Sequence, residues 1–323
     1  MRRCVAGWAG PGRRPWRRAS AMPAWRRRSP RSACVPPRVP CRPPPSPATR
    51  CMMTDGNRVE RALDLFDRHV EELERQAGSQ DFDKGYYLKH RPRFAGTLDL
   101  IAPAQEAGAR ALELGATDFL QVALRHVFGY DEVFGSVFST EIERKYYHRA
   151  VAAAGMETRN PTFSVNLEHD LLPVPPEHFA MVLCCEVLEH MDIDPMFMLV
   201  EVNRVCQMGA ELVLTTPNCC SARNFWKIAH GYRPHFFMQY ERSRSPYRHN
   251  IEWDVHAVAQ LARAAGFEPV TLETTDVFEA PMPEALALLA RNGLTTDHRG
   301  DCIMLRARKV SGVVDRWPAG LYV

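Results

Sequence analysis

Two short stretches of the chain place carboxylates and imidazoles close enough together to do chemistry. The first holds Glu186, Glu189 and His190 directly after an apolar run, and the second holds His249 and Glu252. Carboxylates bind hard divalent cations, and two imidazoles favour Mn²⁺ over Mg²⁺. Without a metal, a histidine is a natural general base. These residue types make the two stretches candidates for binding a divalent cation, or for general-base catalysis by His190 or His249.

Each of these residues also has a structural interpretation. Glu189 would be favoured as a charge at the start of a helix, because the helix dipole attracts an anion there. His190 would equally serve as a packed, hydrogen-bonded histidine. His249 and Glu252 would then only position the segment that precedes the next helix.

Glu113 is a further candidate, two residues before Gly115 at the end of a predicted strand. A carboxylate beside a glycine turn suits the ammonium group of a cationic nucleoside that carries an amino acid, and the turn lets the backbone approach such a ligand. Glu-x-Gly after a strand also occurs by chance, so this pair alone does not identify a ligand.

A longer run of residues is more specific. It comprises, in order, Val165-Asn-Leu-Glu-His-Asp-Leu-Leu-Pro173, Phe179-Ala-Met-Val-Leu-Cys-Cys-Glu-Val-Leu-Glu-His190, Glu201-Val-Asn-Arg-Val-Cys-Gln-Met-Gly209 and Leu212-Val-Leu-Thr-Thr-Pro-Asn218. In this order it resembles the class I, S-adenosylmethionine-dependent methyltransferases of the small-molecule type. The resemblance extends from about Lys84 to Lys309.

The resemblance implies a role for each matching residue. Glu113, Gly115 and Ala116 would hold the methionine part of the cofactor, and Leu167 and Glu168 the adenine. Glu186 would line the pocket beside the sulfonium, and the substrate would be faced by Thr216, Pro217 and Asn218. It also implies methyl transfer to a small-molecule or glycan acceptor, with oxygen as the expected acceptor atom.

Two departures from the family pattern leave a second functional hypothesis open. Thr117 and Phe119 stand where the second and third glycines of the first motif belong, and the second strand does not end in the acid that grips the ribose. Ser136, Asp131 or Glu141 would have to substitute for that acid. The alternative is a non-catalytic module of the same fold that acts through a partner.

The Glu-x-x-Glu-His run with the later His249 also resembles small-RNA 2′-O-methyltransferases and, more loosely, ubiquinone-pathway O-methyltransferases. In the former, two glutamates and two histidines hold Mg²⁺ or Mn²⁺ against the acceptor hydroxyls. The resemblance therefore implies a metal site at Glu186, Glu189, His190 and His249. A metal-dependent RNA 2′-O-methyltransferase is therefore a third reading. The acidity of the chain beyond residue 54 disfavours a nucleic-acid partner.

The elements that position these residues alternate between strand and helix. Strands are expected at 109–114, 132–138, 162–167, 180–185, 211–215, 269–274 and 302–308, and helices at 58–77, 93–101, 119–128, 140–153, 195–205, 255–265 and 283–292. Apolar strands alternating with helices predict a doubly wound α/β fold: a mostly parallel, seven-stranded, Rossmann-like sheet with an N-terminal helical extension. Its ligands should bind at the carboxyl ends of the strands.

The predicted organisation has four parts: residues 1–54, N-terminal helices at 55–103, a methyltransferase domain at 104–309 with a lid at 221–252, and a tail at 310–323. The lid is rich in aromatic and basic residues, which suit a sugar, a phosphate-bearing or a nucleotide-like acceptor. They are Phe225, Trp226, Tyr232, His235, Phe236, Phe237, Tyr240, Arg242, Arg244 and Arg248. A solvated loop whose aromatic residues pack on the sheet is the alternative.

Residues 1–54 differ from the rest of the chain. They hold 13 Arg and 11 of the 25 Pro but no Lys, Asp or Glu, so the remainder carries 28 of the 41 basic residues against all 38 acidic ones. Prolines at this density predict a disordered segment. Translation starting at Met52 or Met53 would remove it, and a transit peptide or nucleic-acid-binding arm is the alternative.

Deleting residues 1–52 is expected to leave the melting temperature and ligand affinity unchanged, because a disordered segment contributes no core. Differential scanning calorimetry of the full and shortened chains measures this directly. A loss of more than about 1 kcal/mol in the free energy of unfolding would show that the segment docks on the domain.

The cysteines and the hydropathy of the sequence indicate the cellular compartment in which the protein is expected. Six of the ten cysteines lie beyond residue 54, in apolar runs and without a Cys-x-x-Cys spacing, which predicts reduced thiols in a cytoplasmic protein. No apolar run reaches the length of a membrane span. The sequence does not specify the oligomeric state.

Overall fold

The computed structural model describes residues 55–77, 83–138, 146–234 and 248–322, all within one compact unit, Met52–Val323. The Arg/Pro segment, Glu141 and the lid residues His235, Phe236, Phe237, Tyr240, Arg242 and Arg244 lie outside them. The predictions for those positions therefore remain predictions. None of the helices in the described ranges has both the length and the apolar character needed to cross a membrane.

The described helices are α1 Asp55–Ala77, α2 Lys84–Leu100, α3 Asp118–His126, the 3-10 helix η1 Leu188–His190, α4 Pro195–Val205, α5 Ala222–Ala229, α6 Val255–Ala264 and α7 Pro283–Arg291. The strands are β1 Arg110–Leu114, β2 Glu132–Val137, β3 Tyr146–Ala153, β4 Met156–Ser164, β5 Phe179–Cys185, β6 Cys206–Pro217, β7 Phe267–Thr275 and β8 Cys302–Lys309.

The strands form one sheet in the order β3-β4-β2-β1-β5-β6-β8-β7. The five strands from β4 to β6 are parallel, and β3 and β8 run antiparallel to their neighbours. Taken in chain order, the parallel strands are arranged 3-2-1-4-5, which is the doubly wound arrangement with its reversal point between β1 and β5. The predicted α/β fold is confirmed, with eight strands in place of seven.

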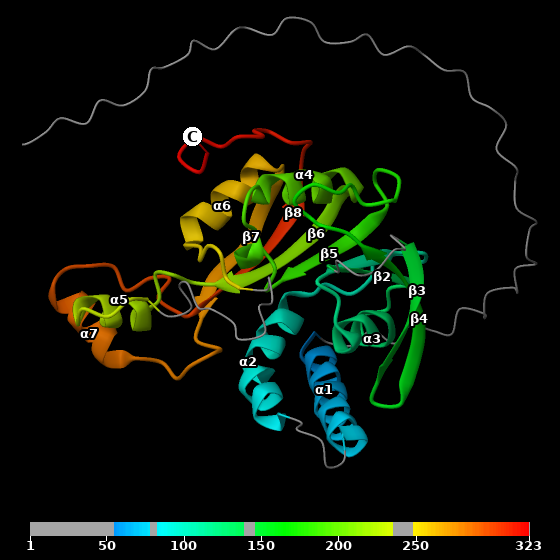
Figure 1. The fold of residues 1–323 in the computed structure, drawn as a ribbon, viewed down its shortest axis with the longest axis horizontal. Helices are drawn as coiled ribbons and strands as arrows, with labels where there is room; N and C mark the ends of the chain where they lie inside the picture. The colour runs from blue at the N-terminus through cyan, green and yellow to red at the C-terminus, as the bar shows by residue number, and fades with distance from the viewer. Residues whose placement is uncertain (1–54, 78–82, 139–145, 235–247, 323) are drawn as a thin grey trace, which may run out of the picture. The chain divides into compact units, whose positions relative to one another are not determined.

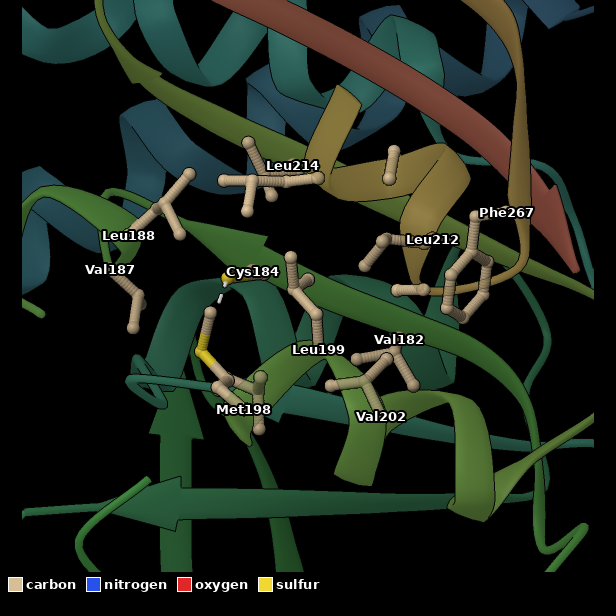
Figure 2. Packing of buried hydrophobic residues seen from close by; sticks show 14 of the residues in the cluster. Val182, Cys184, Val187, Leu188, Met198, Leu199, Val202, Leu212, Leu214 and Phe267 are labelled. Atoms are coloured by element: carbon tan, nitrogen blue, oxygen red, sulfur yellow. Dashed lines mark hydrogen bonds between the residues drawn. The ribbon is translucent and has the colours of Figure 1, made fainter. Parts of the chain in front are cut away.

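Helices cover both faces of this sheet, with α1, α2 and α3 on one side and α4 and α6 on the other (Figure 1). Alternate residues of the central strands therefore enter different cores. Leu112 and Val182 pack with α4 and α6, whereas Met181 and Leu183 pack with the N-terminal helices. Figure 2 shows the first of these cores, where Leu199 of α4 packs among side chains of β5 and β6. Burial on both faces explains why these strands read as continuous apolar runs.

The prediction of a helix over residues 140–153 is wrong for its described part. Tyr146–Ala153 is the strand β3, which pairs with β4 in a hairpin. Burial along β3 alternates as in a strand, and the two-residue turn Ala154-Gly155 has φ values of 52° and 74°. Two positive φ values characterise a type I′ turn, which joins antiparallel strands.

The start of the second helix and the structure of the lid also differ from the predictions. The second helix begins at Lys84 instead of Arg93, because Asp83 caps it by accepting a hydrogen bond from the Tyr86 N–H at 3.0 Å. The predicted lid contains a regular helix, α5, capped by Ser221. Within the lid, Phe225 and Trp226 are half-buried and Tyr232 is exposed.

Candidate functional site

Glu113 is the second-last residue of β1, and its side chain is buried in the interior of the molecule. Its side chain is 1% exposed, and its Oε1 accepts hydrogen bonds from the Thr117 N–H at 3.0 Å and the Thr117 hydroxyl at 2.9 Å. Burial raises the pKa of this carboxyl to about 8, although the Thr117 hydrogen bonds and the charges of Arg149 and Arg93 oppose the shift. Its Oε2 is buried without a hydrogen-bond partner. Burial thus disfavours the charged form of this carboxyl, and a cation beside Oε2 would offset that cost.

The turn after β1 explains both missing glycines. Gly115 has a φ of 69°, and a Cβ there would lie 3.0 Å from the Val187 side chain. Thr117, at the second glycine position, is the N-cap of α3 and also holds Glu113, while its hydroxyl accepts from the Leu120 N–H. Phe119, at the third, packs against α1 and α2. Both departures therefore have structural roles at this turn.

The candidates for the ribose contact lie at different ends of β2. Ser136 is buried near its carboxyl end, where the Ala116 N–H donates to the Ser136 carbonyl at 2.8 Å. Asp131 precedes the strand at the opposite edge of the sheet, where it accepts a hydrogen bond from the Gly108 N–H. The structure thus removes Asp131 from the site, because a residue before a parallel strand lies at the edge away from the ligands. A cofactor contact by Ser136 or Ala116 remains a prediction.

Glu168 holds the backbone that leads into α4. Its Oε1 accepts from the N–H groups of Asp192, Ile193 and Asp194 at 2.9, 2.6 and 2.9 Å. Asp194 is fixed in turn by the Tyr322 hydroxyl at 2.7 Å. Glu168 therefore shapes the loop at this corner of the sheet, and a contact with adenine remains a prediction, as does the packing of half-buried Leu167.

Glu201 and Arg204 of α4 hold a neighbouring loop in place. In α4, Glu201 accepts from the Leu172 N–H at 2.7 Å, and Arg204 donates to the carbonyls of Leu172 and Val174 at 3.0 Å each. The two side chains bind one another at 2.6 Å. They fix the Leu-Pro segment that follows Glu168, and so determine the course of the loop from which Glu168 projects.

Glu186 follows β5 with an unusual backbone conformation. Its φ is 55°, a left-handed value that costs a non-glycine residue energy and is often found at functional sites. Its Oε1 accepts from the Thr215 hydroxyl at 2.8 Å, and its N–H donates to the Thr215 carbonyl at 2.9 Å. The carboxylate is thus directed toward the end of β6.

Glu189, His190 and His249 come together beyond β5. One possible ligand atom from each lies within 4.8 Å of the others, and the imidazole centroids of His190 and His249 are 5.1 Å apart. Glu189 is fully buried, with one carboxyl oxygen accepting from the Thr216 hydroxyl at 2.9 Å and the other without a hydrogen-bond partner. Burial and the charge of Glu186 raise the pKa of Glu189 well above its usual range. Three of the four predicted metal ligands therefore converge.

Glu186 does not belong to that group of three. Its bond to Thr215 directs the carboxylate toward β6, so the predicted four-residue metal site is reduced to three of its members. Glu252 lies beside the group instead, with its Oε1 3.7 Å from the His249 Nδ1.

The polar side chains after β6 are engaged within the chain. Thr216 binds Glu189, as described above, and the buried Asn218 side chain donates to the carbonyls of His298 and Gly300 at 3.0 and 2.7 Å. Asn218 therefore ties the loop before β8 to the sheet, and a substrate contact by Thr216, Pro217 or Asn218 remains a prediction.

Sequence reasoning missed two arginines near this site. Arg149 of β3 forms an ion pair with Asp118 and donates to the Ala116 carbonyl at 3.4 Å. Arg93 of α2 is buried and contributes to the pKa of Glu113. No local pattern marks either residue: β3 was predicted to be a helix, and α2 reaches the site only in the tertiary structure.

The chain resembles solved S-adenosylmethionine-dependent methyltransferases in fold. Similar structures include a chain of the Haloferax volcanii complex of the Trm112 methyltransferase activator, at 16% identity and a TM-score of 0.45, with 77% of this chain and 98% of that one covered. The Mesorhizobium loti enzyme has 15% identity, a TM-score of 0.43 and coverages of 67% and 97%. A Thermotoga maritima methyltransferase has 19% identity and a TM-score of 0.42, with 76% of this chain and 99% of that one covered.

No protein-family model matches the chain, and the comparison with curated proteins finds no match. At identities this low a shared fold does not determine activity, since one fold hosts many functions. The function is therefore inferred from the residues at the carboxyl ends of β1, β5 and β6.

Proposed function

We propose that the chain is an S-adenosylmethionine-dependent methyltransferase that methylates an oxygen of a small-molecule or glycan acceptor. The observation that carries this proposal is Glu113, a buried carboxyl at the reversal point of a doubly wound sheet with one oxygen left without a partner. A cationic amino acid group would satisfy that oxygen. The Gly115 turn beside it leaves the backbone accessible to the same ligand.

The cofactor, when bound, supplies an electrophilic methyl group on a sulfonium. The remaining task of the site is to orient the acceptor and to remove its hydroxyl proton, because positive charge is lost and not created as the methyl is transferred. His190 and His249 are the bases that the geometry offers. Glu189 beside His190, at 3.9 Å, would stabilise the imidazolium that results. The half-buried aromatic residues of α5 are available to pack against an acceptor.

Isothermal titration with S-adenosylmethionine and with its demethylated product tests the proposal. Binding of both, followed by methyl transfer to vicinal-diol, catechol or sugar acceptors, is the expected result. Cofactor binding without any transfer would favour the non-catalytic module of the same fold. Failure of both ligands to bind would overturn the assignment.

A divalent cation at Glu189, His190 and His249 is a second element of the proposal. The buried Glu189 oxygen without a hydrogen-bond partner fits such an ion, because a cation would compensate the charge that burial disfavours. The two imidazoles would favour Mn²⁺ or another transition ion. An ion there would lower the pKa of a coordinated acceptor hydroxyl and direct it toward the methyl group.

Turnover is expected to fall after EDTA treatment and to return when Mn²⁺ or Mg²⁺ is added, and His249→Ala should prevent the recovery. His256→Ala is the matched control, because His256 is an exposed histidine of α6 outside the cluster. Full turnover in EDTA would exclude the metal and leave His190 or His249 as the general base. A small RNA is tested as an acceptor beside the diols, and its methylation would support the RNA 2′-O-methyltransferase alternative.

A further inference from the structure

Among the residues that the structure describes, Arg93 is a buried cation with no counter-charge in direct contact. Its side chain projects from α2 and is 8% exposed, and its Nε has no hydrogen-bond partner. Within the described ranges, its contact is with the ring of the neighbouring Phe94, with Cζ 4.5 Å from the ring centroid. An unpaired charge in the interior is costly, so a guanidinium in this state calls for an anion that is not part of the chain.

The packing of α2 brings Arg93 toward the carboxyl edge of the parallel strands. Gly96, three residues after Arg93, lies against Met304 of β8, and Met304 pairs with Thr215, whose hydroxyl binds Glu186. The charge of Arg93 also opposes the rise that burial causes in the pKa of Glu113 at the end of β1. Ligands of doubly wound sheets bind at this edge.

The helix that carries Arg93 is held firmly in place. A Cβ at Gly96 would lie 2.6 Å from the terminal methyl of Met304 in β8, so α2 approaches the sheet as closely as a glycine permits. His90 and Thr97 occupy the same helical face as Arg93, and each has a buried polar atom without a hydrogen-bond partner. Burial and the charge of Arg93 lower the pKa of His90 to about 4, so its imidazole is neutral.

Glu113 supplies the complementary half of the arrangement. Its Oε2 is buried and without a partner, as is the Arg93 Nε. An acceptor for an ammonium and a donor for a carboxylate thus occur within electrostatic range of one another, which is the pattern that an α-amino-acid group requires. The planar guanidinium is suited to bidentate binding of a carboxylate.

We propose that Arg93 binds the α-carboxylate of the amino acid portion of S-adenosylmethionine, while Glu113 binds its α-ammonium. This inference rests on the proposed function and extends it to a residue of the N-terminal helices. Those helices then form part of the cofactor site. The methionine portion is recognised by two side chains of opposite charge, from α2 and from β1.

Isothermal titration of the full chain with two ligands tests the assignment. S-adenosylhomocysteine carries the amino acid, whereas 5′-methylthioadenosine has the same nucleoside without it. Arg93→Met is expected to weaken S-adenosylhomocysteine at least tenfold and to leave 5′-methylthioadenosine unchanged. Arg91→Met is the matched control, because Arg91 lies on the same helix but pairs with Asp67 of α1 at 2.7 Å. It should leave both affinities unchanged.

The outcomes separate this inference from the proposed function. If the unmodified chain binds S-adenosylhomocysteine and Arg93→Met binds it equally well, the Arg93 assignment alone is overturned. An equal loss for both ligands also overturns it, because Arg93 would then support the fold. If the unmodified chain does not bind S-adenosylhomocysteine, the proposed function fails and the assignment with it.

Thermal unfolding adds a readout that needs no turnover. Without ligand, Arg93→Met should melt at the same temperature as the unmodified chain or higher, since it removes an unpaired buried charge. S-adenosylhomocysteine should raise its melting temperature less than that of the unmodified chain. If Arg93→Met does not fold, Arg93→Lys carries the test: it keeps the charge but loses the planar fork, and a several-fold weakening for S-adenosylhomocysteine alone is expected.

Discussion

Glu113→Gln is expected to make the protein more stable at pH 8 and to leave its stability near pH 4.5 almost unchanged. Burial raises the pKa of Glu113 from 4.5 to about 8 in the folded chain. A carboxyl with a raised folded pKa contributes stability fully below its unfolded pKa and loses that contribution as pH rises toward the folded pKa. The loss across this window is about 5 kcal/mol at most, at about 1.4 kcal/mol for each pKa unit. Glutamine does not ionise and avoids it, while its amide oxygen can still accept from Thr117.

Urea unfolding of both proteins at pH 5 and pH 8 measures this difference. Glu132→Gln is the matched control, since Glu132 is a carboxylate of the same sheet whose side chain is 53% exposed and pairs with Arg110. Its stability difference from the unmodified chain should not change over this range. Parallel pH curves for Glu113→Gln and the unmodified chain would show that Glu113 remains ionised in the folded protein.

The same substitution is expected to weaken cofactor binding, most strongly above pH 8. The amide cannot supply the negative charge that an ammonium group prefers, so stability and function make opposite demands on residue 113. Binding to the unmodified chain at pH 7 should release a proton from Glu113. Titration in buffers of different ionisation enthalpy detects that proton, and its absence would indicate that the ammonium binds elsewhere.

Glu168→Ala is expected to lower the free energy of unfolding by about 2 kcal/mol and cofactor affinity by about 1–3 kcal/mol. The first effect arises because three backbone N–H groups lose a charged acceptor, with water replacing part of it. The second follows if the loop that Glu168 holds, or Glu168 itself, contacts the adenine.

Glu168→Gln separates these two contributions, because the amide oxygen can still accept from the loop. Retained stability with reduced affinity would assign an adenine contact to the carboxylate. Urea unfolding and calorimetric titration give the two quantities, and Glu157→Ala, at an exposed position of β4, is the control. Unchanged affinity in Glu168→Ala would show that the predicted adenine position is wrong.

The amino-acid pattern alone predicts most of the elements and their class. β5 reads as an apolar run because both faces of the sheet are covered, and α4 was predicted with its observed bounds, 195–205. The position of Glu113 between a strand and a turn could also be predicted from the neighbouring residues alone. These features depend on neighbours within one strand or one helical turn, so a single stretch of sequence determines them.

Where a residue lies relative to elements far away in the sequence could be learned only from the tertiary structure. Residues 146–153 contain alanine, arginine and histidine, which fit a helix locally, but pairing with β4 makes them a strand. Asp131 is close in sequence to the predicted ribose position yet lies at the opposite edge of the sheet. The hydrogen bonds by which the Asn218 amide ties the loop before β8 to the sheet likewise depend on tertiary packing.

The sequence by itself thus determined the alternation of strands and helices, the doubly wound class and the carboxylates that follow β1 and β5. Only the tertiary structure decided which charges remain without partners. Arg93 is an ordinary helix residue in the sequence, and its burial depends on how α2 packs against β8. The physical reason is that burial and pairing are properties of the space between elements, where desolvation sets the state of a charge, and local sequence does not specify that space.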